Sequence, residues 1–181
     1  DRVLALGEDG KLYTTPVNTN NIMAPQNVVT VNQASDFGSP VGSEYQLEPS
    51  TTYVVSGLVN IGTDRLRFGS NTAVIGTNRF SDGIIYTGTG GLFYVNDETF
   101  QVQEMFLSCA NGSVFDLTTV NQSTVIVTNC FASCDSVGTI DGYWNTVFRS
   151  FSVITATTAG LTFTGAARSF NISNSLWTAF V

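Results

Sequence analysis

The chain of 181 residues contains no histidine and few charged residues. The missing histidine removes the commonest general base and the commonest metal ligand of proteins. Charged residues make up 12% of the sequence, which is about half of their usual share in soluble domains. The polar surface must therefore consist mainly of Thr, Ser, Asn and Gly. Such a composition is more typical of extracellular β-proteins than of helical cytosolic enzymes.

Positive charge is especially scarce, because Lys11 is the single lysine among 7 basic residues, against 14 acidic ones. The formal net charge of −7 disfavours binding to nucleic-acid phosphates and to anionic membrane surfaces. No apolar run approaches the ~18 residues of a membrane span, and no basic segment followed by an apolar stretch marks a signal peptide. We therefore expect neither a nucleic-acid partner nor membrane insertion.

The first 45 residues differ in texture from the rest of the chain. Residues 1–15 predict a small hairpin, because an Asp-Gly turn at Asp9 and Gly10 separates two apolar stretches. Residues 16–45 hold three of the four prolines and many Asn, Ser and Gln side chains. A segment of this composition does not form a core of its own. We therefore interpret residues 1–45 as a hairpin and an extended attachment arm, and residues 46–181 as a separate domain.

From residue 46 onward, short apolar stretches alternate with Gly, Asn, Asp, Ser and Thr, a pattern that predicts strands and no long helix. The predicted strands are 53–59, 65–68, 73–75, 83–86, 92–95 and 100–107. The later part repeats, with phenylalanines spaced by 25, 20 and 19 residues at Phe106, Phe131, Phe151 and Phe170. A period of about 20–25 residues is the signature of a β-solenoid, and the chain has room for about six coils. We expect the four phenylalanines to stack as a ladder inside it.

The region from Gln46 to the end resembles the pectate-lyase-like right-handed parallel β-helices, particularly those of bacteriophage tailspikes and other virion appendages. The residues that carry this resemblance are short strands broken by Gly, Asn or Asp, such as Arg65–Gly69 and Ala73–Gly76, together with the repeated phenylalanine coil. The N-terminal stretch LALGEDGKLYTT is similar to a small repeat of phage fibre and tail proteins. The expected fold is all-β: a right-handed parallel β-helix of about six coils, preceded by the hairpin and arm.

The resemblance also implies a function at the virion surface or outside the cell. We expect a non-enzymatic fibre, spike or capsid decoration that attaches to other virion proteins through its N-terminal arm and binds host-surface glycans. A polysaccharide-degrading enzyme of the tailspike kind and a bacterial adhesin fragment are the alternatives. The sequence ends in an apolar stretch with exposed strand edges, which invite pairing. We therefore expect a homo-oligomer, a trimer as in related spikes, with Trp177 and Phe180 at a subunit contact.

Two groups of residues are candidates for a site. Asp116 and Asp141 lie 25 residues apart, so stacking in register would bring their carboxylates to the roughly 5 Å that suits a retaining glycosidase. Both follow an apolar residue, and we interpret them instead as polar residues of the outer face. Tyr143, Trp144 and Asn145 are candidates for sugar binding in a bulged coil, with packing of Trp144 on a neighbouring strand as the other interpretation.

Two of the three cysteines share the same spacing. Cys109 and Cys134 lie 25 residues apart, with Cys130 nearby. Neighbouring coils would bring the pair within disulfide range, while a small apolar stack is the other interpretation. A metal site would need a further ligand in a chain without histidine. We expect neither a metal nor another cofactor.

Overall fold

The computed structural model describes residues 2–6, 12–16, 27–96, 98–119, 123–165 and 169–177. Strands dominate this described part, and its single helical element is a 3-10 turn, η1 (Ala34–Phe37). The strands are β1 (Arg2–Leu6), β2 (Leu12–Pro16), β3 (Asn27–Val31), β4 (Glu44–Gln46), β5 (Thr51–Val55), β6 (Leu58–Gly62), β7 (Arg65–Arg67), β8 (Thr72–Gly76), β9 (Gly83–Tyr86), β10 (Gly91–Asn96), β11 (Phe100–Gln103), β12 (Phe106–Thr118), β13 (Thr124–Thr128), β14 (Phe131–Asp141), β15 (Asn145–Arg149), β16 (Ser152–Thr164), β17 (Ser169–Ser173) and β18 (Leu176–Trp177).

The N-terminal hairpin is present. β1 and β2 pair antiparallel, with Leu4 opposite Thr14, as the Asp-Gly signal predicts. The turn at Asp9 and Gly10 and the following residues 17–26 lie outside the described residues.

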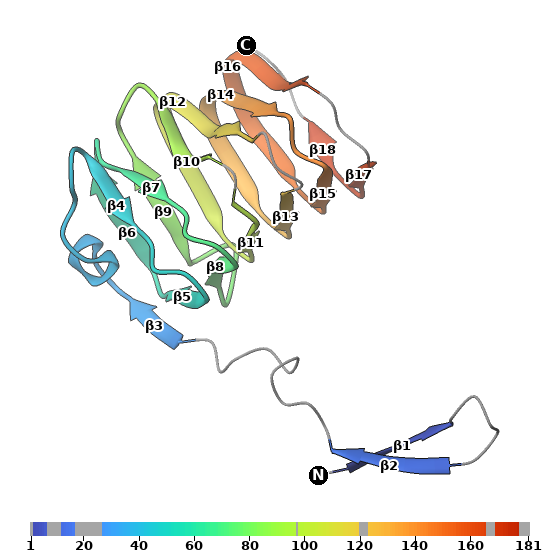
Figure 1. Ribbon diagram of the computed structural model, residues 1–181. Helices are drawn as coiled ribbons and strands as arrows, with labels where there is room; N and C mark the ends of the chain where they lie inside the picture. Colours follow the sequence, from blue (N-terminus) through green and yellow to red (C-terminus); the bar gives the residue numbers. More distant parts are fainter. Residues whose placement is uncertain are drawn as a thin grey trace.

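The strands from β3 to β18 pair in parallel and form a β-helix of about six turns. A first column stacks β3, β5, β8, β11, β13, β15 and β17. A second column runs from β6 and β9 through the first halves of β12, β14 and β16 to β18. A third column runs from β4, β7 and β10 through the second halves of β12, β14 and β16. Figure 1 shows the coils stacked in chain order, from blue to red. The expected all-β parallel β-helix is confirmed.

The β-helix begins earlier than the sequence predicts. β3 pairs with β5 in parallel, and its last residue, Val31, is fully buried. The ring of Phe37 in η1 packs on those of Tyr45 and Tyr53, at centroid distances of 6.0 and 5.6 Å. Residues 27–45 therefore form a first coil with its own share of the core, where the sequence predicts an extended arm. A short strand between polar residues gives too weak a pattern to be recognised alone.

The expected ladder of four buried phenylalanines is wrong. Phe106 and Phe131 do pair in register, but the alternation of burial along β12 and β14 places both on the outer face. Phe151 is fully buried, and Phe170 lies in the first column with 47% of its surface exposed. The phenylalanines of the interior, besides Phe151, include Phe68, Phe93, Phe100, Phe115 and Phe148.

A two-residue corner between the first and second columns sets the repeat. The first corner residue has a left-handed backbone with φ of 51 or 52° in four successive coils, at Glu104, Asn129, Ser150 and Asn174. Its backbone N–H donates to the neighbouring coil, as from Glu104 to the carbonyl of Thr128 at 3.0 Å. The second corner residue is fully buried in three of these coils, as Met105, Cys130 and Phe151. The corner thus turns the chain and fills the core at once.

The cysteines belong to this interior. Cys109 and Cys134 pair in register on neighbouring coils, as their spacing predicts. All three cysteines are buried, and none of them forms a disulfide. Burial raises the pKa of the Cys109 thiol, that of Cys130 to about 12 and that of Cys134 to about 11. Neutral thiols of this kind act as small apolar side chains, so the structure has the apolar stack.

Candidate functional site

The third coil, β8 to β10, departs from the two-residue corner. A longer segment, residues 77–82, connects β8 to β9 there. Extra residues in one repeat of a solenoid form a loop on one face, which is often the binding face. We call residues 77–82 the corner loop.

Asp82 anchors the corner loop and is only 5% exposed. Its Oδ2 accepts hydrogen bonds from the backbone N–H groups of Thr77 and Asn78 at 2.8 and 2.9 Å, and from the Thr77 hydroxyl at 2.7 Å. Its Oδ1 accepts from the N–H of Gly57 in the preceding coil at 3.0 Å. Burial acts to raise the pKa of Asp82, but these hydrogen bonds outweigh it and hold the pKa well below its usual range. The ionised carboxylate therefore fixes the loop on the scaffold.

The anchored loop carries Arg79 and Phe80 to the outer face of the second column. Phe80 is 76% exposed, and its ring centroid lies 5.1 Å from that of Phe131 in the fifth coil. The guanidinium carbon of Arg79 lies 4.4 Å from the ring centroid of Phe131 and 5.2 Å from that of Phe80. Phe106 is the register neighbour of Phe131 on the same face. We call Arg79, Phe80, Phe106 and Phe131 the aromatic platform.

Gly83 allows the strand that carries Phe106 to approach closely. It is the register partner of Phe106. A Cβ atom at Gly83 would lie 2.3 Å from the carbonyl oxygen of Phe106 and 2.9 Å from its Cβ. Because real Cβ atoms do not approach backbone so closely, any other residue at Gly83 would displace the strand that carries Phe106.

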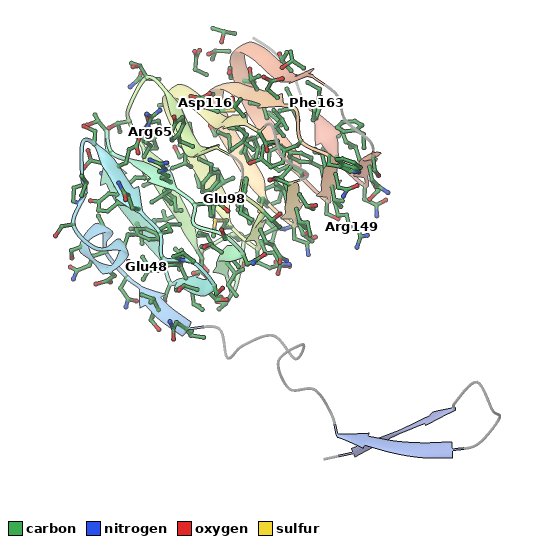
Figure 2. The ribbon with its side chains drawn as sticks, in the orientation of Figure 1. Glu48, Arg65, Glu98, Asp116, Arg149 and Phe163 are labelled. Carbon is green, nitrogen blue, oxygen red and sulfur yellow. The ribbon has the colours of Figure 1, made fainter. Side chains whose placement is uncertain are left out.

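A second cluster lies on the outer face of the third column. Arg65 donates from Nε and Nη2 to Oε1 of Glu44 at 3.0 and 2.7 Å, and its guanidinium carbon lies 3.8 Å from the ring centroid of Tyr94. Arg67 Nη1 lies 3.7 Å from Oε2 of Glu44. Arg65 Nη1 lies 3.9 Å from Oδ2 of Asp116, and Figure 2 shows these two residues close together. The two positive and two negative charges balance, so the Arg65 cluster is neutralised from within.

The two candidate acids, Asp116 and Asp141, are not brought together. Asp116 pairs with Thr139 and Asp141 with Thr118, because the register of β12 and β14 shifts after Cys109. The two acids are thus two residues out of step, about 8 Å apart between their Cα atoms by strand geometry. Both side chains lie on the outer face, as expected. The close carboxylate pair of a retaining glycosidase is missing at these positions.

The predicted sugar-binding aromatic, Tyr143, is in fact a core residue. It is 1% exposed, its hydroxyl donates to the backbone carbonyl of Glu98 at 3.1 Å, and its ring meets Phe100 edge-on at 6.4 Å. Trp144 is half-buried beside it. Asn145 begins β15 and is half-buried as well. The exposed ring of Phe80 lies instead at the platform, which spacing and composition did not indicate.

The last coils expose several apolar side chains. Phe170 and Ile172 are 47% and 40% exposed, although their register neighbours Thr146 and Phe148 are buried. Leu176 is 59% exposed. The backbone of Trp177 lies in β18, in register with Val153. Phe180 lies outside the described residues. The subunit contact expected at Trp177 and Phe180 stays a prediction.

Family models, curated proteins and solved structures were compared with the chain, and none of them matches it. In the part of the chain that the structure describes, no helix is long and apolar enough to cross a membrane. No group of three or more His, Cys, Asp or Glu side chains is placed to hold a metal ion among those residues.

Proposed function

We propose that the chain is a non-enzymatic surface component that binds glycans, of the virion fibre, spike or decoration kind that its sequence resembles. The observation that carries this proposal is the aromatic platform. The exposed ring of Phe80 lies against the half-buried ring of Phe131, and an exposed apolar patch rimmed by polar residues marks a binding surface. Sugar rings stack their C–H faces on aromatic rings, while nearby polar groups bond their hydroxyls. The polar residues Asn78 and Ser81 of the corner loop flank Arg79 and Phe80 in the sequence.

The anchoring of the loop supports a binding role. A ligand that meets a loop already held in place does not have to order it on binding, so less affinity is lost. The carboxylate of Asp82 provides this order through bonds to Gly57 on the previous coil and to Thr77 and Asn78 within the loop. A loop that served only to connect β8 to β9 would need neither the extra length nor the anchor, because later coils turn in two residues.

The resemblance adds an assembly to this proposal. We propose a homotrimer that attaches to other virion proteins through the N-terminal hairpin and segment, and that displays the β-helix at the virion surface. Trp177 and Phe180 remain the residues proposed for the subunit contact.

A glycan array with fluorescently labelled full-length chain tests the proposal. The wild-type chain should bind at least one class of bacterial or host glycan, and Phe80→Ala should weaken that binding at least tenfold. The matched control is Phe163→Ala, since Phe163 is 36% exposed in β16 and far from the corner loop along the chain. Figure 2 shows Phe163 in the late coils.

Two results would contradict this proposal. One is an array without any bound glycan. The other is binding that Phe163→Ala weakens as much as Phe80→Ala does. If a bound polysaccharide is shortened during incubation, and Asp116→Asn or Asp141→Asn stops the shortening, the polysaccharide-degrading alternative replaces the non-enzymatic one.

A further inference from the structure

We infer that the aromatic platform binds a carboxylated sugar, such as a uronic acid unit, and that Arg79 selects it by pairing with the carboxylate. This inference rests on the proposed glycan-binding function and adds the substrate class. It follows from what surrounds the guanidinium of Arg79.

The guanidinium of Arg79 lies against two rings, and no described residue provides it with an acceptor. Its carbon lies within 4.4 and 5.2 Å of the ring centroids of Phe131 and Phe80. Cation–π contacts of this kind fix the plane of the guanidinium against the rings. Among the described residues, no carboxylate lies within 4.0 Å of Arg79, and its guanidinium donates no hydrogen bond to a protein acceptor. The N–H groups at its edge are thus left for a ligand.

Two carboxylates of this region, in the corner loop and in the corner of the next coil, accept hydrogen bonds from other groups. Asp82 accepts its hydrogen bonds from the loop backbone and from Gly57. Glu104, in the corner of the next coil, accepts from the side-chain amide of Asn129. Neither carboxylate forms an ion pair with Arg79.

Ring faces and a guanidinium edge together match the chemistry of a sugar acid. The planar fork of arginine bonds a carboxylate in a bidentate manner. The exposed ring of Phe80 offers a face for the C–H groups of the same sugar unit or its neighbour. A neutral hexose would use the rings alone and leave the guanidinium unpaired. The platform should therefore prefer the acid form of a sugar over the neutral form.

Isothermal titration with a matched pair of oligosaccharides tests this preference. One ligand is a uronic-acid oligosaccharide, and the other is the same chain with its carboxyl groups reduced to primary alcohols. The wild-type chain should bind the acid about 10- to 100-fold more tightly, as expected for a charge-assisted hydrogen-bonded pair. Arg79→Gln should bring both ligands to the affinity of the neutral one.

Two further variants separate pairing from overall charge. Arg149→Gln removes the same charge from an exposed arginine on β15 in the first column, and it should keep the preference. Arg79→Lys keeps the charge but loses the fork, and it should retain only part of the preference. A sulfated oligosaccharide of the same backbone should bind less tightly than the uronic acid.

Each outcome decides one claim. Equal wild-type affinity for acid and neutral ligands, or a preference that survives Arg79→Gln, would refute the role of Arg79 while leaving glycan binding intact. A full preference in Arg79→Lys would show selection by charge alone, and tighter binding of the sulfated ligand would show a site for a different anion. Either result would refute the carboxylate assignment. Failure of the wild-type chain to bind either ligand, together with an empty glycan array, would refute the proposed function itself.

Discussion

Two arginines stack on aromatic rings on the outer surface of the same sheet, and they differ in what they pair with. Arg65 lies over Tyr94 in the third column and donates twice to Glu44. Arg79 lies over Phe131 on the second column, and no described carboxylate pairs with it. Both guanidinium groups therefore make a cation–π contact, but only that of Arg65 also donates to a described protein carboxylate. The paired Arg65 stabilises the coils that it joins, whereas Arg79 has N–H donors that a ligand can use.

A core substitution should have the largest effect on stability. Phe115 is fully buried and lies in register with Phe93 on the inner face. Phe115→Ala should cost about 3–5 kcal/mol of unfolding free energy because it leaves a cavity. Phe106→Ala, on the outer face, should cost only about 1 kcal/mol. Chemical denaturation measures both, and equal costs would contradict the assignment of inner and outer faces.

Removal of the loop anchor should come next in size. Asp82→Asn replaces a buried charged acceptor by an amide whose NH2 group would face backbone donors, at a cost of about 2–3 kcal/mol. The control is Asp116→Asn in the Arg65 cluster, where the side chain is 49% exposed and the cost should be about 0.5 kcal/mol or less. Thermal and urea unfolding measure both costs. If Asp82→Asn is as mild as Asp116→Asn, the loop is not held by this carboxylate.

The anchor should also make stability depend on pH in acid. The hydrogen bonds to Asp82 hold its folded pKa below the unfolded one, so its contribution is complete above the unfolded value of about 4. The part of the unfolding free energy that ionised Asp82 contributes is lost as the pH falls from about 4 toward the folded pKa. The loss is at most about 1.4 kcal/mol per pH unit. Unfolding free energies measured from pH 6 to pH 2 should fall less steeply for Asp82→Asn. Identical slopes in the two proteins would contradict the assignment.

The smallest stability effects should separate the two arginines themselves. Arg65→Gln leaves the carboxylate of Glu44, whose side chain is 13% exposed, without its main donor and should cost about 1–2 kcal/mol. Arg79→Gln loses only exposed ring contacts and should cost about 0.5 kcal/mol. Urea titration of both variants measures the difference. A larger cost at Arg79 would mean that its role is structural.

The sequence predicts the strands well where burial alternates. The strands expected at 83–86 and 92–95 coincide with or fall within β9 and β10, and the spacing of Cys109 and Cys134 predicts their register. Spacing alone does not fix the face, because neighbouring positions of a strand point to opposite sides. Phe106 and Phe131 therefore share a row, but on the outside.

A bulge explains why the two acids do not stack in register, although both lie on the outer face as predicted. From Cys109 to the next register point, Ser113, β12 advances four residues, while β14 advances two from Cys134 to Ser136. Equal spacing of 25 in the sequence thus no longer means equal position after the bulge. The platform was missed for a different reason. The sequence of residues 77–82 is typical of an ordinary polar turn. No local pattern predicts that Asp82 holds this loop so that it contacts a strand of the fifth coil.

The central claim is that Arg79, and not Arg65, meets a bound glycan. Nitrogen–proton correlation spectra of the arginine Nε–Hε groups test it most directly, with the signals assigned through Arg65→Gln and Arg79→Gln. On titration with the best glycan of the array, the Arg79 signal should move in a saturable manner while the Arg65 signal stays in place. Movement of the Arg65 signal alone, or a glycan that binds without moving the Arg79 signal, would contradict the account.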